Sequence, residues 1–212
     1  MADHGVEQKL AAILAADAVG YSALMGADER ATVATLDDCR AVFRAHVAAQ
    51  NGRVVDTAGD SVLAVFPSAI GAVRAGPAVQ ADLRSLNKDL ADEHRMPFRI
   101  GVNLGDVIEK ADGTVYGDGV NIAARLESLA EPGGLTISGT TFDQVDGRLD
   151  VPFDYLGEKA VKNIAKPVRA YRASLSAEDS GPQPMAAGPE AERPSIAVLP
   201  FQNLSGDAEQ EY

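Results

Sequence analysis

The sequence predicts an α+β fold with a ferredoxin-like βαββαβ core, extra C-terminal β and α elements, and helices packed on a mostly antiparallel sheet. The first observation is the order of its apolar segments, in which short runs of strand length alternate with two long segments of helical period. The second is composition: 46% of the 212 residues are hydrophobic and 24% are charged, which is close to an average globular protein. We expect the helices to lie on one face of the sheet.

The first half of the chain supplies most of this core. The expected elements are a strand over Leu10–Ala16, a helix from Asp28 to about Gln50, a hairpin of Arg53–Asp56 with Ser61–Phe66, and a helix from Ala69 to about Leu90. Asn51-Gly52 ends the first helix. Gly76-Pro77 lies inside the second helix and predicts a kink or a short break there.

The second half continues the pattern and then leaves it. The expected elements are a hairpin of Phe98–Asn103 and Asp106–Lys110 around Leu104-Gly105, a helix over Val120–Ala130, a strand over Leu135–Ser138, a short helix over Thr140–Val145, and strands over Val151–Leu156 and Pro167–Ser174. One domain over residues 1–175 is therefore predicted. Residues 176–194 hold four prolines and several acids, which is typical of a linker. Residues 195–212 contain one strand-like run, so we expect them to begin a second, truncated domain.

Charge and cysteine content exclude several kinds of protein. The net charge is −12 with no block of Lys or Arg to offset it, so neither a nucleic acid nor an anionic membrane is an expected partner. Cys39 is the one cysteine, which rules out an intrachain disulfide and suits a reducing cytoplasm. Leu10–Ala16 is far shorter than the roughly 20 residues of a membrane span. We expect a cytoplasmic protein.

Asp17 is the first polar residue that a core does not need. It ends a buried strand and is followed by Gly20 and Ser22 before a helix begins. The amide groups of such a loop, together with the start of the helix, favour a bound phosphate. The alternative is that Asp17 caps the helix, and the residues alone favour neither interpretation.

Asp60 is the second, at the start of the strand Ser61–Phe66. In a βαββ arrangement the first and third strands are neighbours, so Asp60 and Asp17 can lie side by side. Two such carboxylates repel each other unless cations lie between them, and Mg²⁺ is usually held by one or two carboxylates plus substrate phosphates. Asp60 could instead be an ordinary turn residue beside Gly59.

The third group lies on the helix Val120–Ala130. Asn121, Arg125 and Ser128 follow at helical spacing and form one polar stripe on an otherwise apolar helix. An Arg there needs an anionic partner, which is either a ligand or an internal acid such as Glu127 or Asp118. The chain has no GxxxxGK or GxGxxG loop, and Ser22 has no plausible His and Asp partners, so P-loop, Rossmann and acyl-transfer chemistry have no support.

With these groups assembled, the sequence resembles the catalytic domain of a class III nucleotidyl cyclase. The motifs ILAADAVGYSALM, GRVVDTAGDSVLAVF, RIGVNLGDVI and VYGDGVNIAARLESLAEPGGL occur in that family's order and approximate spacing, most like bacterial adenylate cyclases. The resemblance runs from about Val6 to Leu175. SIAVLPFQNLSGD resembles the start of a second domain that often follows such cyclases.

The resemblance implies a role for each matching residue. Asp17 and Asp60, with the Ala18 carbonyl as a possible further ligand, would hold two Mg²⁺ or Mn²⁺ ions per site. Asn121 would orient the ribose, and Arg125 would stabilise charge that develops at the α-phosphate. The remaining phosphate ligands would be the amides of Val19, Gly20, Tyr21 and Ser22, with Lys162 on the departing pyrophosphate.

In the family, one domain supplies the metal acids of a site and a second domain supplies the Asn and Arg. Since this chain carries both sets, the resemblance implies a head-to-tail homodimer with two composite sites. The base-reading positions fall at Asp56 and Thr114. Adenylate-specific members usually have Lys at the first position and guanylate-specific members Glu, and an ionised Asp56 can only accept hydrogen bonds.

Three functions follow from the resemblance. The leading hypothesis is an adenylate cyclase that converts ATP to cyclic AMP and pyrophosphate in intracellular signalling. The second is a guanylate cyclase that uses GTP, which the chemistry of Asp56 favours and Thr114 does not. The third is a catalytically degenerate domain that binds nucleotide and regulates an appended domain.

Overall fold

The computed structural model describes residues 6–161, 164 and 166–175. Its strands are β1 (Val6–Ala18), β2 (Arg53–Asp56), β3 (Ser61–Phe66), β4 (Phe98–Lys110), β5 (Val115–Tyr116), β6 (Leu135–Ser138), β7 (Phe153–Lys159) and β8 (Val168–Ala173). Its helices are α1 (Tyr21–Ala27), α2 (Glu29–Ala49), α3 (Ala69–Lys88), the 3₁₀ helix η1 (Asp92–His94), α4 (Asp118–Leu129) and α5 (Gly139–Val145). The mixed α+β class and the mostly antiparallel sheet are confirmed.

The strands form one sheet in the order β2-β3-β1-β4-β6-β8-β7, and β5 pairs with β4. Every pair is antiparallel except β4 with β6. The long strand β1 therefore lies between β3 and β4, and it pairs with β4 along its whole length and with β3 from Ala12 to Asp17. This central position decides which side chains meet β1 at its C-terminal end.

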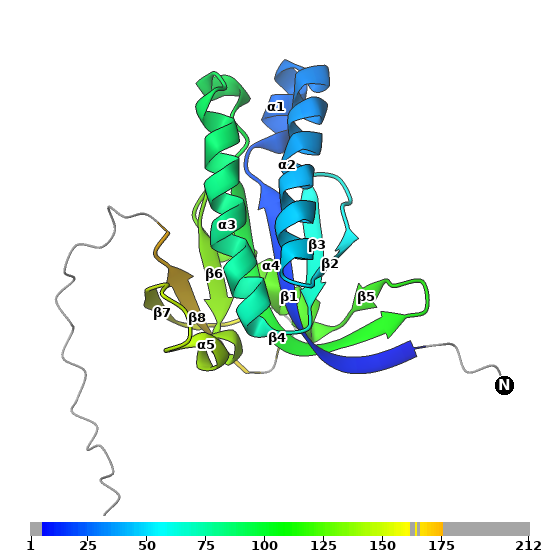
Figure 1. Ribbon diagram of the computed structural model, residues 1–212, viewed down its shortest axis with the longest axis vertical. Coiled ribbons are helices and arrows are strands. Elements are labelled where there is room, and N and C mark those ends of the chain that lie inside the picture. The colour runs from blue at the N-terminus through cyan, green and yellow to red at the C-terminus, as the bar shows by residue number, and fades with distance from the viewer. Residues whose placement is uncertain (1–5, 162–163, 165, 176–212) are drawn as a thin grey trace, which may run out of the picture. The chain divides into compact units, whose positions relative to one another are not determined.

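Helices cover both faces of this sheet. α2 and α3 lie side by side on one face, in front of the strands in Figure 1, and α4 lies behind them. The side chains of β1 alternate accordingly: Ala12 and Leu14 join the large core beneath α2 and α3, while Ile13 and Ala15 join a smaller core with Ala123 of α4. The expectation that all helices share one face is therefore wrong for α4.

Local capping explains why several predicted boundaries agree with the structure. The Asp28 side chain accepts a hydrogen bond from the Ala31 amide at 3.0 Å and begins α2, and Ser68 caps α3 through the Gly71 amide at 3.1 Å. β2, β3 and β6 have the bounds expected from the sequence. Boundaries are well predicted where a cap or a turn marks them in the sequence.

One prediction based on glycine is wrong, and one is wrong in part. Leu104-Gly105 is no hairpin turn, because both residues are extended within β4 and pair with Ala12 and Ala11 of β1. α3 is continuous through Pro77, so the helix has no break there, and Gly76 lets Leu135 of β6 approach closely, since a Cβ there would lie 2.9 Å from a Leu135 methyl carbon. Both glycines serve close packing. The short elements α1 and β5 were not predicted.

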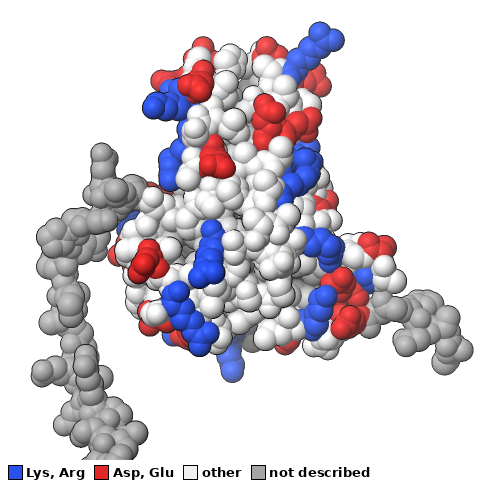
Figure 2. All heavy atoms as spheres, viewed as in Figure 1, with Lys and Arg blue, Asp and Glu red and all other residues white. Residues whose placement is uncertain are grey.

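Figure 2 shows acidic and basic side chains interspersed over the face formed by α2 and α3. Among the described residues, no helix has the length and hydropathy that a membrane crossing requires. The predicted linker over residues 176–194 and the predicted second domain over residues 195–212 lie outside the described residues.

Candidate functional site

Asp17 and Asp60 meet at the C-terminal end of β1. Asp17 pairs with Ser61 on β3 and with Arg99 on β4, and Asp60 immediately precedes Ser61. The expected neighbourhood of the first and third strands is thus confirmed, and it places Asp17, on β1, beside the turn that carries Asp60. Because directly opposite residues point to the same face of a sheet, Asp17 and Arg99 both lie on the face that α4 covers.

Burial and charge act together on this group. Burial raises the pKa of Asp17, and the neighbouring Asp60 raises it further, while Arg99 lowers it. Asp17 and Asp60 are both half-buried. A protein keeps two such carboxylates together at a free-energy cost that a bound cation can offset.

Arg99 and Glu127 complete the group, and the sequence did not assign either of them to it. The Arg99 Nε atom is buried and has no hydrogen-bond partner in the described part of the chain. The pKa of Glu127 is raised to about 7 by burial and then by Asp17, with Asp60 adding to the shift and Arg99 opposing it. The available signal for Arg99 was a charge inside the apolar run Phe98–Val102.

Glu127 reaches this group because α4 packs unusually close to β4. A Cβ on Gly101 would lie 2.2 Å from both the Ala123 carbonyl oxygen and the Glu127 amide nitrogen. A Cβ on Gly105 would lie 3.4 Å from the Gly119 Cα atom. α4 therefore runs along β4 from Gly105 toward Gly101 and ends beside Arg99, which faces the same side two residues earlier.

The polar stripe of α4 points elsewhere. The buried residues of the helix are Gly119, Ala123 and Leu126, whereas Asn121 and Arg125 are exposed. Within the described residues Arg125 has no acid within 4.0 Å, so the internal salt bridge with Glu127 or Asp118 that the sequence left open is not formed. One chain thus presents two groups: the acids with Arg99 against the sheet, and Asn121 with Arg125 on its surface.

The turn between β2 and β3 is held by an arginine that the sequence did not single out. Arg40 of α2 donates through Nη2 to the Thr57 carbonyl at 2.6 Å and to the Gly59 carbonyl, and its Nη1 lies 3.5 Å from Asp37. Gly59 has φ of 59°, a backbone conformation that glycine adopts easily. Arg40 therefore fixes the segment between Asp56 and Asp60.

Asp56 reaches the α4 face through a bulge. The register of β2 shifts between Val54 and Asp56, so that Asp56 pairs with Leu63, which packs with the core under α4. Arg53, on the same strand, donates to the Gly113 carbonyl at 3.0 Å and to Glu109 at 3.0 Å. It ties β2 to the β4–β5 turn at the residue before Thr114.

The predicted phosphate ligands follow β1 directly. Ala18 is the last residue of the strand, and Gly20 begins α1 with φ of 77°. The Val19 amide donates to the Pro97 carbonyl at 2.8 Å, so it already has a partner, unlike what the sequence led us to expect. Tyr21 and Ser22 form the first turn of α1, where amides lack intrahelical acceptors. Lys162 lies outside the described residues.

The acid pair fits a divalent cation. No set of three or more His, Cys, Asp or Glu side chains within the described ranges is arranged to hold a metal. Asp17 and Asp60 alone match the usual binding of Mg²⁺, in which one or two carboxylates are completed by water and substrate phosphates. Burial and, after it, repulsion by Asp60 raise the pKa of Asp17, and a bound cation would offset both effects.

A family model and several known proteins match this chain. The family model described as "Adenylate and Guanylate cyclase catalytic domain" matches residues 6–173. A "Putative adenylate cyclase 3" of Rhizobium meliloti is 44% identical over the whole of this chain, which covers 37% of that protein's length. An "Adenylate cyclase" of Glutamicibacter nicotianae is 33% identical over 59% of the chain and 30% of its own length. The chain thus spans about a third of these relatives.

Solved structures show the same fold. An "Adenylate/Guanylate Cyclase/Hydrolase" from Silicibacter pomeroyi superposes with a TM-score of 0.73 at 37% identity, covering 79% of this chain and 98% of that one. The adenylyl cyclase CyaB from P. aeruginosa gives a TM-score of 0.72 at 25% identity, covering 83% and 99%.

Proposed function

Since the chain belongs to the family of class III nucleotidyl cyclase catalytic domains, we propose that it is an adenylate cyclase, which converts ATP to cyclic AMP and pyrophosphate. The observation that carries this proposal is the register that sets Asp17 opposite Arg99 and next to Asp60 at one end of the sheet. The curated relatives described above bear the name adenylate cyclase, which favours ATP over GTP.

Asp17 and Asp60, with the Ala18 carbonyl, would hold two Mg²⁺ or Mn²⁺ ions in each site. When bound, such ions activate an attacking oxygen and stabilise charge on a leaving one. Arg99 lies opposite Asp17 with its Nε unpartnered, and it is placed to meet the phosphate oxygens that approach these acids. The acids would thus bind the substrate through its phosphates and would not distinguish one base from another.

The other residues position the nucleotide. Asn121 would orient the ribose so that its 3′-hydroxyl lies in line with the α-phosphate, and Arg125 would stabilise the charge that develops there. The amides of Gly20, Tyr21 and Ser22 and the Lys162 ammonium group would bind the remaining phosphates. Positioning and electrostatics account for most of the rate, because the attack itself needs no protein nucleophile.

We propose further that the site forms between two chains of a homodimer. Asn121 and Arg125 are exposed on the outer side of α4, while the acids lie at the inner side of the same helix, so neither group completes the other within one chain. Each variant Asp17→Ala and Arg125→Ala should be inactive alone. An equal mixture should recover about a quarter of wild-type activity, because half of the dimers then carry one intact site.

The decisive measurement is product formation. The purified protein is incubated with ATP or GTP and Mg²⁺ or Mn²⁺, and cyclic AMP and cyclic GMP are both quantified. Cyclic AMP is the expected main product, lost in Asp17→Ala. If neither nucleotide gives product, the enzymatic proposal is wrong, and binding without turnover would indicate a regulatory nucleotide-binding domain.

A guanylate cyclase is the second candidate, because Asp56 can accept hydrogen bonds from guanine but cannot donate one to adenine. Asp56→Glu lengthens the acceptor and should raise the ratio of GTP to ATP turnover, whereas Asp56→Lys should lower it. The ratio of the two kcat/KM values measures this preference. If neither variant changes it, Asp56 does not read the base.

A further inference from the structure

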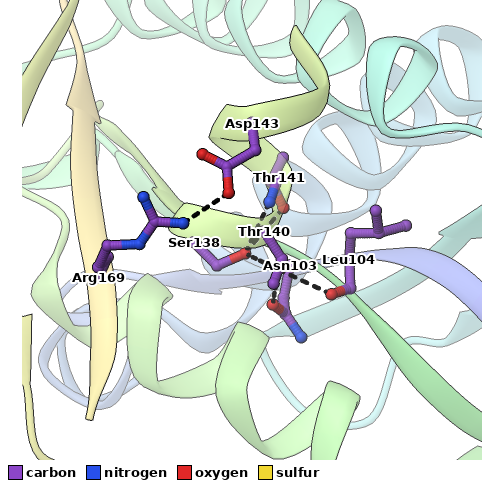
Figure 3. A network of polar contacts seen from close by, with 7 residues as sticks. All are labelled: Asn103, Leu104, Ser138, Thr140, Thr141, Asp143 and Arg169. Carbon is purple, nitrogen blue, oxygen red and sulfur yellow. Dashed lines mark hydrogen bonds and ion pairs between the residues drawn. The ribbon is translucent and has the colours of Figure 1, made fainter. Parts of the chain in front are cut away.

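A buried polar network joins β4 to the start of α5 (Figure 3) and, through Asn103, to the start of α4, and the proposed chemistry does not use it. At its centre is Asn103 of β4, which is only 2% exposed. Its Nδ2 donates to the Gly119 carbonyl of α4 at 3.1 Å, and its Oδ1 lies 3.4 Å from the Thr140 hydroxyl of α5. A single amide side chain thus holds two helices to one strand.

A group of hydroxyls lies beside that amide on the α5 side. The Thr140 hydroxyl donates to the Leu104 carbonyl at 2.9 Å, and the Ser138 hydroxyl lies 2.8 Å from the Thr140 hydroxyl and 2.9 Å from the Thr141 hydroxyl. Ser138 in turn caps α5 by accepting from the Thr141 amide at 3.2 Å. Since the Gly119 carbonyl can only accept, the NH₂ group of Asn103 is directed toward α4 and its oxygen toward Thr140.

The first turn of α4 packs closely on β4, since a Cβ on Gly119 would lie 2.8 Å from the Asp106 carbonyl oxygen, and Asn103 adds a side-chain hydrogen bond at this contact. The residue before the helix is Gly117, which offers no side-chain cap, and Gly119 contributes only backbone. The first catalytic candidate, Asn121, follows Gly119 by two residues. A shift of the first turn would therefore move Asn121 directly, while Glu127 is held separately by the close contact at Gly101.

We propose that Asn103 is a positioning residue that sets where Asn121 meets the ribose of the nucleotide. The inference rests on the proposed composite site. Asn103 touches neither substrate nor metal, and it acts through the Gly119 carbonyl. Asn103 therefore affects the half of the site that Asn121 and Arg125 supply, although its side chain is buried on the same strand as Arg99.

The test uses Asn103→Ala and Asn103→Leu, which keeps most of the side-chain volume and cannot donate to Gly119. Both should lower kcat between about tenfold and a hundredfold, because small misplacements of an orienting group have effects of this size. The Mn²⁺ concentration for half-maximal activity should stay unchanged. Thr136→Val is the control, because it removes a hydroxyl that is equally buried but has no partner in the described part of the structure.

Mixed dimers give the readout that a general loss of structure would not. Mixing Asn103→Ala with Asp17→Ala should restore activity, since one site then has intact acids and an intact partner helix. Mixing Asn103→Ala with Asn121→Ala should restore none, because both changes damage the same half. If both mixtures behave alike, or if Thr136→Val is as impaired as Asn103→Ala, the inference is overturned.

Two controls separate this outcome from other failures. The mixture of Asp17→Ala with Arg125→Ala tests the composite site itself, so its failure would reject the proposed function rather than the role of Asn103. Should Asn103→Ala not fold, as judged by circular dichroism, Thr140→Val replaces it. That change removes the hydroxyl that lies 3.4 Å from the Asn103 amide oxygen, and it should show the same complementation pattern with a smaller loss of kcat.

Discussion

The two groups on either side of α4 differ in how much of their environment the chain itself supplies. The group of Asp17, Asp60, Arg99 and Glu127 lies against the sheet, where burial and mutual charge shift the pKa values of two of its acids. The group of Asn121 and Arg125 is exposed and has no ion pair in the described residues. The first group is therefore organised by contacts within the chain, whereas no contact in the described part of the chain organises the second.

The largest effect is expected from the contact that holds both groups in place. A methyl group on Gly101 would lie 2.2 Å from two backbone atoms of α4, so Gly101→Ala should lower the free energy of unfolding by about 3 kcal/mol. Urea denaturation of the variant and the wild-type chain measures this difference in the free energy of unfolding. Gly26→Ala in α1 is the control, because no atom lies within 4 Å of its added methyl group, and it should be neutral or stabilise by up to about 1 kcal/mol.

Removing Arg99 or Arg125, one from each group, compares how much each group contributes to stability. Arg99→Ala leaves Asp17 and Glu127 without their opposing charge and should cost about 2 kcal/mol of stability. Arg125→Ala should change stability by less than about 0.5 kcal/mol, because its side chain is exposed and unpaired among the described residues. Thermal and urea unfolding of both variants provide the comparison. Equal losses would show that the surface group is also organised within one chain.

The raised pKa of Glu127 predicts that the free energy of unfolding depends on pH in metal-free buffer. Its pKa is raised from 4.5 to about 7, so the folded protein keeps a proton that the unfolded chain has lost between these values. Stability should therefore fall as the pH rises through this window, by roughly 1 to 2 kcal/mol after allowance for solvent screening, and then level off. Urea unfolding in EDTA at pH 5 and pH 8 measures the fall.

Glu127→Gln should remove most of that decline, while Glu158→Gln, an exposed acid on β7, should keep it. A decline of the same size in both variants would mean that Glu127 is not coupled to the acid group. Added Mg²⁺ should also reduce the decline in the wild-type chain, because a bound cation favours ionised carboxylates.

The smallest effect concerns the turn that carries Asp60. Arg40→Ala removes the donor to the Thr57 and Gly59 carbonyls and should raise the Mn²⁺ concentration for half-maximal activity roughly threefold, since a looser turn places the carboxylate less well. Arg44→Ala, on the exposed side of the same helix, should have no effect. If Arg40→Ala lowers kcat but leaves the Mn²⁺ concentration for half-maximal activity unchanged, the turn does not position Asp60 for metal binding.

How much the sequence predicts depends on whether the cause is local. Asp28 and Ser68 mark helix starts in the sequence itself, and the order of strands was enough to bring Asp17 beside Asp60. Gly105 was misjudged because glycine favours turns locally, whereas its role is to admit Gly119 of α4 across the sheet. Arg99 was missed for the same reason: its importance depends on Asp17, which is 82 positions earlier in the sequence.

The close approach of α4 to β4 also limits how this domain can be controlled. Gly101, Gly105 and Gly119 bring the backbones of α4 and β4 into close contact, which opposes movement of the helix along or across the strand. An input signal therefore cannot work by sliding the helix within one chain. We expect regulation to act on the relative rotation of two chains. Such a rotation would change the distance between Asn121 and Arg125 of one chain and the acids of the other.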